Sequence, residues 1–279
     1  MDYLAIAVWI IFILILLYCF REPIKTFFSG LEKKNKVENI EESGRKKYHI
    51  IATDLEIPAP LTDRTEQKIR HTGYTVSYNK QWKIPNWVAY ELTPDELTGN
   101  ARRTNKFTVD PLVKGTSATN SDYTRSGLDR GHMAPAGDMS WNETAMQESF
   151  YFSNMCPQDP GLNRGVWKSL EEKVRDWVTT DSTLYIVCGT LSGEKDKTIG
   201  KNKVKVPHGF YKVILAPWTS TPKGIAFIFA NKNEKNRLET YAVPIDSVET
   251  LTGIDFFPSL PDELEAEIES TLRIEDWTF

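Results

Sequence analysis

The amino-acid sequence predicts an α+β domain with a central antiparallel sheet, preceded by a single N-terminal transmembrane helix. Three observations lead to this prediction. Residues 3–20 contain no charged side chain and are followed by a strongly charged segment. Several later segments are short and rich in β-branched and aromatic residues, a composition typical of strands. Helical patterns are few and do not alternate regularly with these segments, which favours an antiparallel sheet.

The uncharged run at residues 3–20 would span about 27 Å as an α-helix, close to the thickness of the hydrocarbon core of a membrane. The chain begins Met-Asp and carries bulky residues where a signal peptide would be cleaved. We therefore expect a retained membrane anchor rather than a cleaved signal or a buried helix. Basic residues follow this run but do not precede it, a bias that by the positive-inside rule favours a cytoplasmic domain.

We divide the chain into an anchor at residues 1–22, a charged linker at 23–55 and a folded domain at 56–279. The linker is mostly charged and has no apolar face, as is typical of solvated segments. The net charge of −4 means that a nucleic-acid partner would need a local basic patch rather than attraction by the whole chain. The three cysteines form no CxxC pair and no zinc-type cluster, so we interpret them as buried thiols.

Six segments of the domain have the composition of strands, namely residues 74–78, 87–92, 149–154, 183–189, 211–216 and 225–230. The clearest helix covers residues 164–179, where large apolar residues recur at helical spacing on one face. A second helix is predicted at 262–272 after a capping-type start at Ser259, with a proline just inside. A short helix at 93–99 would begin at a Thr93 cap and end at Gly99.

The stretch DRGHMAPAGD at residues 129–138 gathers residues that can handle charge on a chain that can turn tightly. His132 is a natural general base at neutral pH, although a lone histidine is more often structural. Arg130 carries a permanent planar cation suited to phosphate or carboxylate. We interpret Asp129 as support for the turn or for Arg130, and not as a metal ligand.

The segment from 153 to 175 offers a second set of polar residues. Asn163 precedes the predicted helix, where it is either a helix cap or an oxygen ligand for Mg²⁺. Glu171 and Arg175 are four residues apart, which is the spacing of an ordinary surface pair. Alternatively, Glu171 serves a metal site and Arg175 holds a phosphate oxygen.

Together, DRGHMAPAGD, SNMCPQ and LNRGVWKSLE resemble the DNA/RNA non-specific endonucleases of the ββα-metal superfamily, a group that includes endonuclease G. NWVAYEL, RTNKFTVDP, VPHGFYKVIL and LTGIDFFPSLPDELE extend the resemblance over roughly residues 70–275. It implies a ββα-metal domain and a Mg²⁺-dependent enzyme that cleaves phosphodiester bonds within DNA and RNA, with Mn²⁺ as a substitute ion. The pattern departs from the family at His208, which is shifted by one position and receives no role.

The resemblance also implies roles for individual residues. His132 matches the general base that activates water, Asn163 the direct protein ligand of the metal, and Glu171 the residue that holds a water of the metal. Asn154 matches an asparagine that supports the site. The family's cations near the phosphate correspond to Arg130, Arg175 and an upstream arginine in this chain. For the upstream arginine we choose Arg103 over its close competitor Arg102.

The implied partners are DNA and RNA, bound through the phosphate backbone, and a membrane, bound through residues 3–20. The oligomeric state stays open, a homodimer included. Two alternatives to the endonuclease are a catalytically weak nucleic-acid-binding or uptake module and a phosphodiesterase of small nucleotides. We favour an extracytoplasmic or organellar catalytic domain, against the charge bias at the anchor, because a free nuclease in the cytoplasm would be toxic.

Overall fold

The computed structural model describes residues 40–42, 45–48, 50 and 53–279. It divides the chain into two units, residues 1–49 and residues 50–279. In the first unit, β1 (Ile40–Glu42) pairs with β2 (Arg45–Lys47) as a short antiparallel hairpin within the predicted linker. The predicted membrane segment at 3–20 lies outside the described residues. Within the described part of the chain, no helix has the length and apolar character needed to span a bilayer.

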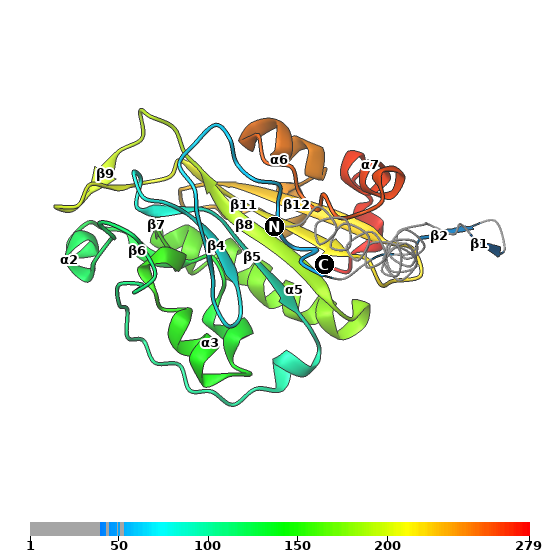
Figure 1. Ribbon diagram of the computed structural model, residues 1–279, viewed down its shortest axis with the longest axis horizontal. Helices are drawn as coiled ribbons and strands as arrows, with labels where there is room; N and C mark the ends of the chain where they lie inside the picture. The colour runs from blue at the N-terminus through cyan, green and yellow to red at the C-terminus, as the bar shows by residue number, and fades with distance from the viewer. Residues whose placement is uncertain (1–39, 43–44, 49, 51–52) are drawn as a thin grey trace, which may run out of the picture. The chain divides into compact units, whose positions relative to one another are not determined.

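A seven-stranded sheet forms the centre of the second unit, and every neighbouring pair of its strands is antiparallel (Figure 1). The expected α+β fold with a central antiparallel sheet is therefore confirmed. In spatial order the strands are β13 (Ala242–Val243), β12 (Lys223–Ala230), β11 (Gly209–Ala216), β8 (Leu184–Leu191), β5 (Ile84–Leu92), β4 (Thr75–Asn79) and β3 (Gln67–Arg70). A separate pair joins β9 (Thr198–Ile199) to β10 (Val204–Lys205).

Five of the six strand predictions are confirmed by β4, β5, β8, β11 and β12. The prediction at residues 149–154 is wrong. Helix α3 (Glu143–Glu148) ends there, and residues Phe152–Asn154 form a 3-10 turn. Phe150 and Phe152 are fully buried. Their aromatic character therefore reflects burial in the core and not an extended backbone.

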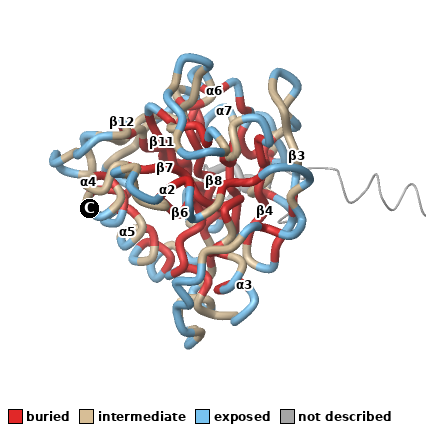
Figure 2. The backbone as a smooth tube through the Cα atoms, turned by 90° about the vertical axis from the view of Figure 1, so that its left-hand side faces the viewer, coloured by how far each residue is buried: buried red, intermediate tan, exposed pale blue. Residues whose placement is uncertain are grey.

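Helices cover both faces of the sheet. Helix α5 (Val166–Asp181) packs on one face, where Trp167 contacts Phe210 and Phe229. Helices α6 (Ile245–Thr252) and α7 (Asp262–Ser270) pack on the other face against β12. Every residue of β11 is consequently buried, and Figure 2 shows buried chain running through the sheet.

The helix predictions at 164–179 and 262–272 are confirmed as α5 and α7, while α6 was not predicted. The predicted cap at Ser259 is wrong, because Pro261 occupies the capping position without a side-chain hydrogen bond. The expected helix at 93–99 is the 3-10 helix Asp95–Thr98, and the predicted Thr93 cap is wrong, because Pro94 occupies the capping position. Glu96 accepts hydrogen bonds from the preceding Thr93. Other short helices are α2 (Asn120–Tyr123), α4 (Pro160–Asn163) and the 3-10 turns Ala136–Met139, Leu238–Tyr241 and Ile274–Asp276.

A small ββα unit carries the motifs singled out in the sequence. Strand β6 (Asp129–His132) pairs antiparallel with β7 (Met155–Gln158), and His132 stands opposite Met155. Helix α4 (Pro160–Asn163) and then α5 follow β7 along the chain. A β-carbon on Gly131 would lie 2.1 Å from the Gln158 side chain, so this tight pairing requires glycine. The unit brings the end of β6 and the start of α5 together.

Candidate active site

An open cleft of about 460 Å³ lies between the ββα unit and the preceding chain segment. It brings together six of the seven predicted site residues: Arg103, Arg130, His132, Asn163, Glu171 and Arg175. Arg164 and Lys168 also line it, so the cleft is basic although the whole chain is acidic. Such a local excess of positive charge attracts a polyanion.

His132 ends β6 with its ring held between Phe107 and Phe150, at centroid distances of 5.8 and 5.0 Å. The residue is 9% exposed, and its Nε2 atom has no hydrogen-bond partner among the described residues. Burial, together with the charges of Arg103 and Arg130, lowers the pKa of His132 to about 3. The ring is therefore neutral at pH 7 and has a nitrogen free to accept a proton.

Asn154 does not line the cleft but lies fully buried behind it. Its Oδ1 accepts a hydrogen bond from the amide of Ala134 at 2.9 Å. Its Nδ2 donates to the carbonyls of Ala134 and Ser149, both at 2.8 Å. Two of these three hydrogen bonds fasten Ala134, in the loop that follows His132, and the third joins the side chain to Ser149.

Asn163 is not the cap of α5, because it is the last residue of α4 and Gly165 holds the capping position. The helix-cap interpretation is therefore wrong. The Nδ2 of Asn163 donates to Asp129 Oδ2 at 2.9 Å, and this leaves Oδ1 as the atom available to a ligand. Arg164 donates twice to the same carboxylate, at 2.8 and 2.7 Å. Asp129 therefore orients Asn163 instead of holding Arg130.

The protonation of Asp129 suits this orienting role. Burial would raise the pKa of its carboxyl, but hydrogen bonds from Arg164 and Asn163 outweigh burial and lower it below the ordinary value. The carboxylate is consequently ionised at neutral pH and acts only as an acceptor. An acceptor-only neighbour fixes which end of the Asn163 amide faces the cleft.

The end of the DRGHMAPAGD stretch holds Arg175 in place. Arg175 Nη1 donates to Asp138 Oδ1 at 2.7 Å, and the fully buried Asp138 also accepts from the Tyr90 hydroxyl at 3.0 Å. A β-carbon on Gly137 would lie 3.1 Å from the same Nη1, so the glycine permits this close approach. Arg175 thus pairs with Asp138 and not, as in the surface-pair interpretation, with Glu171.

Two arginines of the cleft rest on aromatic rings. The guanidinium of Arg130 lies 4.5 Å from the centroid of Phe107, and that of Arg103 lies 5.2 Å from Phe150. Neither forms an ion pair with a described carboxylate, so their charge is available to an anion. Arg102 does not line the cleft, which favours Arg103 of the two competitors. The sequence offered no signal for the two phenylalanines beyond their apolar character.

Glu171 is half-buried on the cleft side of α5. Burial raises its pKa to about 7, with a further rise from Asp138, while Lys212 and Arg175 act in the opposite direction. Lys212 was missed in the sequence analysis. It is fully buried on β11, with Nζ 4.8 Å from the Trp167 ring, and no residue in the described part of the chain is its hydrogen-bond partner. A lysine inside the apolar run FYKVIL was the available signal.

The geometry of the cleft agrees with comparisons to known proteins. The family model described as DNA/RNA non-specific endonuclease matches residues 52–263. Mitochondrial nuclease EXOG of Mus musculus is 36% identical over 209 residues, which cover 68% of this chain and 57% of the relative. Mitochondrial endonuclease G of Bos taurus is 34% identical over 203 residues, which cover 67% of this chain and 68% of the relative.

A solved structure shows the same fold. The crystal structure of an EndoG/EndoGI complex matches with a TM-score of 0.67 and 31% identity, covering 71% of this chain and 89% of the other. The chain spans only 57% of the length of the mouse relative. Similarity therefore extends over the domain that carries the cleft, in both sequence and structure.

Proposed function

The chain belongs to the DNA/RNA non-specific endonuclease family, and from this premise we propose that it is a Mg²⁺-dependent endonuclease that hydrolyses phosphodiester bonds in both DNA and RNA. One observation carries the proposal. A neutral histidine with an unpaired Nε2 lies in the same cleft as Arg103 and Arg130, which have no described ion-pair partner. A base beside uncompensated positive charge suits attack of water on a phosphate.

In this mechanism His132 takes the proton from the attacking water. Arg103, Arg130 and Arg175 bind phosphate oxygens and stabilise the charge that develops on them. Because a bound phosphate would offset the two arginine charges that depress the pKa of His132, substrate binding would make this histidine a stronger base. Contacts to phosphate carry no base information, which agrees with cleavage of many sequences and of both sugars.

The described residues also fit a divalent ion. Asn163 Oδ1 is left free by the hydrogen bond to Asp129, and Glu171 adds a carboxylate in the same cleft. Mg²⁺ prefers a small number of protein ligands that are all hard oxygens, and Mn²⁺ would substitute for it at such a site. When bound, the ion would supply positive charge to the phosphate and the leaving group.

We also propose an organellar location, which is supported by relatives whose names describe them as mitochondrial. Membrane attachment through residues 3–20 stays a prediction, and the oligomeric state stays open. Protease treatment of intact organelles would test the location, since an enclosed domain is cut only after the membrane is opened. Degradation in intact organelles would contradict it.

The activity is tested by incubating the full chain with plasmid DNA and with RNA in the presence of Mg²⁺ or EDTA. We expect cleavage of both polymers with Mg²⁺ and none with EDTA. For the His132→Ala variant in this assay, His208→Ala is the matched control. His208 is exposed, pairs with Asp196 and lies outside the cleft. No cleavage by the wild type, or full cleavage in EDTA, would contradict the proposal.

The same assay separates the alternatives. Binding of nucleic acid without turnover in either Mg²⁺ or Mn²⁺ would favour the binding or uptake module. Faster cleavage of dinucleotides than of long polymers would favour a small-nucleotide phosphodiesterase. A neutral histidine in a basic cleft argues for turnover of a polyanion over both alternatives.

A further inference from the structure

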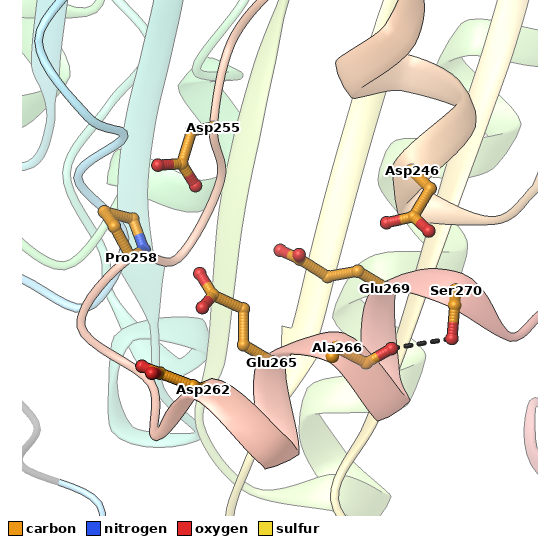
Figure 3. Close-up of a pocket in the computed structure, with 8 residues that line it drawn as sticks. All are labelled: Asp246, Asp255, Pro258, Asp262, Glu265, Ala266, Glu269 and Ser270. Atoms are coloured by element: carbon orange, nitrogen blue, oxygen red, sulfur yellow. Dashed lines mark hydrogen bonds between the residues drawn. The ribbon is translucent and has the colours of Figure 1, made fainter.

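An acidic hollow lies between α6 and α7, on the face of the sheet opposite to α5 (Figure 3). Five carboxylates line it: Asp246, Asp255, Asp262, Glu265 and Glu269. No described residue that lines the hollow carries a positive charge. Figure 3 shows the side chains of Glu265 and Glu269 extending from α7 into the hollow, between Asp255 on one side and Asp246 on the other.

Glu269 is the residue that distinguishes this hollow from an ordinary acidic surface. It is 5% exposed, and its Oε1 atom has no hydrogen-bond partner among the described residues. A buried carboxylate without a partner is costly, and proteins normally pair it or place it on a metal. Burial and the nearby Glu249, Glu265 and Asp246 raise the pKa of Glu269 to about 9. Without a cation the side chain thus holds a proton at pH 7.

The spacing of the carboxylates matches one coordination sphere. Asp246, Glu249 and Glu269 each offer one oxygen, and the three atoms lie within 4.8 Å of one another. Oxygens on opposite sides of a Ca²⁺ ion are about 4.6–5.2 Å apart, so three oxygens within 4.8 Å of one another can all bind one such ion. Mg²⁺ usually takes only one or two carboxylates from a protein, so a set of three favours Ca²⁺, and waters would complete its sphere.

We propose that Asp246 and Glu249 of α6 and Glu269 of α7 bind a divalent cation of the calcium class. The ion would connect the two helices and neutralise carboxylates that otherwise repel one another. The site is separate from the nuclease cleft, on the opposite face of the sheet, and does not depend on the proposed activity.

The test measures the melting temperature of the full chain, freed of metal with EDTA and then given millimolar Ca²⁺ at pH 7. The test is made in the Asn163→Ala variant, which lacks the proposed metal ligand of the nuclease cleft. Any stabilisation of this variant by Ca²⁺ therefore comes from a site outside the cleft. We expect Ca²⁺ to raise the melting temperature by about 5 °C in this background. The rise should fall below about 1 °C once Glu269→Gln or Asp246→Asn is added.

Glu267→Gln is the matched control, because it is the same change on the same helix at a residue that pairs with Arg273. It should keep the full response. Titration calorimetry at pH 7 should show a heat of Ca²⁺ binding in the Asn163→Ala protein and none once Glu269→Gln is added. Asp246 is exposed, so Asp246→Asn provides the comparison even if Glu269→Gln does not fold.

Two results would overturn the proposal. One is the absence of any stabilisation or heat of binding up to millimolar Ca²⁺ in the Asn163→Ala protein. The other is a response that survives both Glu269→Gln and Asp246→Asn. An equal response to Mg²⁺ and Ca²⁺ would overturn the assignment to the calcium class.

Discussion

The cleft beside α5 and the hollow between α6 and α7 are built from charges of opposite sign. In the cleft, arginines surround a buried histidine, and burial with their charge lowers its pKa to about 3. In the hollow, carboxylates surround a buried glutamate, and burial with their charge raises its pKa to about 9. Both groups are neutral at pH 7, because each is buried among charges of its own sign. The sign of the charge in each cluster indicates the kind of ion that it would attract, which is an anion in the cleft and a cation in the hollow.

The two regions also differ in how their charges are held. In the cleft, rings and buried carboxylates support the arginines, as Phe107 supports Arg130 and Asp138 supports Arg175. In the hollow, the described contacts offer the carboxylates little support beyond a hydrogen bond from the amide of Phe256 to Glu249 at 2.8 Å. A preorganised group of cations suits catalysis, whereas loosely supported carboxylates suit binding of an ion.

The largest expected effect concerns the base of the cleft. His132→Ala should lower the turnover number for plasmid cleavage about 10²–10⁴-fold, the usual contribution of a general base. The Ca²⁺ response of the hollow should not change, because the two sites lie on opposite faces of the sheet. Retention of the full rate by this variant would contradict the mechanism.

A smaller effect is expected at Asp129, which orients Asn163. Asp129→Ala should raise the Mg²⁺ concentration needed for half-maximal cleavage about 10–100-fold, as is typical for partners of metal ligands. The rate should recover at high Mg²⁺. Asp176→Ala, which removes an exposed carboxylate from α5, is the control and should behave as the wild type. Equal Mg²⁺ dependence of the Asp129 variant and the control would exclude an orienting role.

Lys212 tests whether buried charge behind the cleft tunes Glu171. Its positive charge lowers the pKa of Glu171, so Lys212→Met should raise that pKa. The acidic limb of the cleavage profile should then move up by roughly one pH unit. Lys223→Met is the matched control, because Lys223 also lies against a tryptophan, with Nζ 4.4 Å from the Trp277 ring. An unchanged profile would show that Lys212 serves packing alone.

The smallest effects appear in stability. The folded-state pKa of Glu269 lies above its unfolded value, so the stability it contributes is lost as pH rises towards 9. The folded-state pKa of His132 lies below its unfolded value, so its contribution is lost as pH falls from about 6.5. Each slope is at most about 1.4 kcal/mol per pH unit.

Urea unfolding at several pH values checks this comparison. Without Ca²⁺, the stability gap between wild type and Glu269→Gln should change between pH 7 and 9. The gap between wild type and His132→Asn should instead change between pH 4 and 6.5. A gap that stays constant over its own window would show that the group is not shifted in the direction stated.

Much of the fold was accessible from local patterns. The apolar spacing of Trp167, Leu170 and Val174 predicted α5, and β-branched runs predicted five strands of the sheet, because these signals repeat within a few residues. The prediction failed at 149–154, where aromatic residues are buried on a turn. Local composition reports burial there but not backbone conformation. Helix α6 was not predicted because its eight residues form only about two turns, in which a helical period hardly repeats.

Part of the candidate site was also accessible. DRGH with an asparagine ahead of a helix pointed to His132, Asn163 and Glu171, and the structure gathers all three in one cleft. The sequence did not indicate that Lys212 lies behind Glu171. It also did not indicate that Glu269, one residue after the apolar Ile268 of an acidic helix, is buried. Glu265 and Glu269 carry like charges at i,i+4 spacing, which indicated repulsion along one face of the helix but did not indicate a pocket.

The sequence by itself determined the class of fold and the residues of the ββα unit, because these depend on periodicity and on short motifs. Only the tertiary structure decided which atoms face one another. Asp129 turns the Asn163 amide from 34 residues away, Asp138 holds Arg175 from 37 residues away, and Asp246 meets Glu269 from a separate helix. Such pairs arise from strand register and from helices packing on a face of the sheet, which no local pattern encodes.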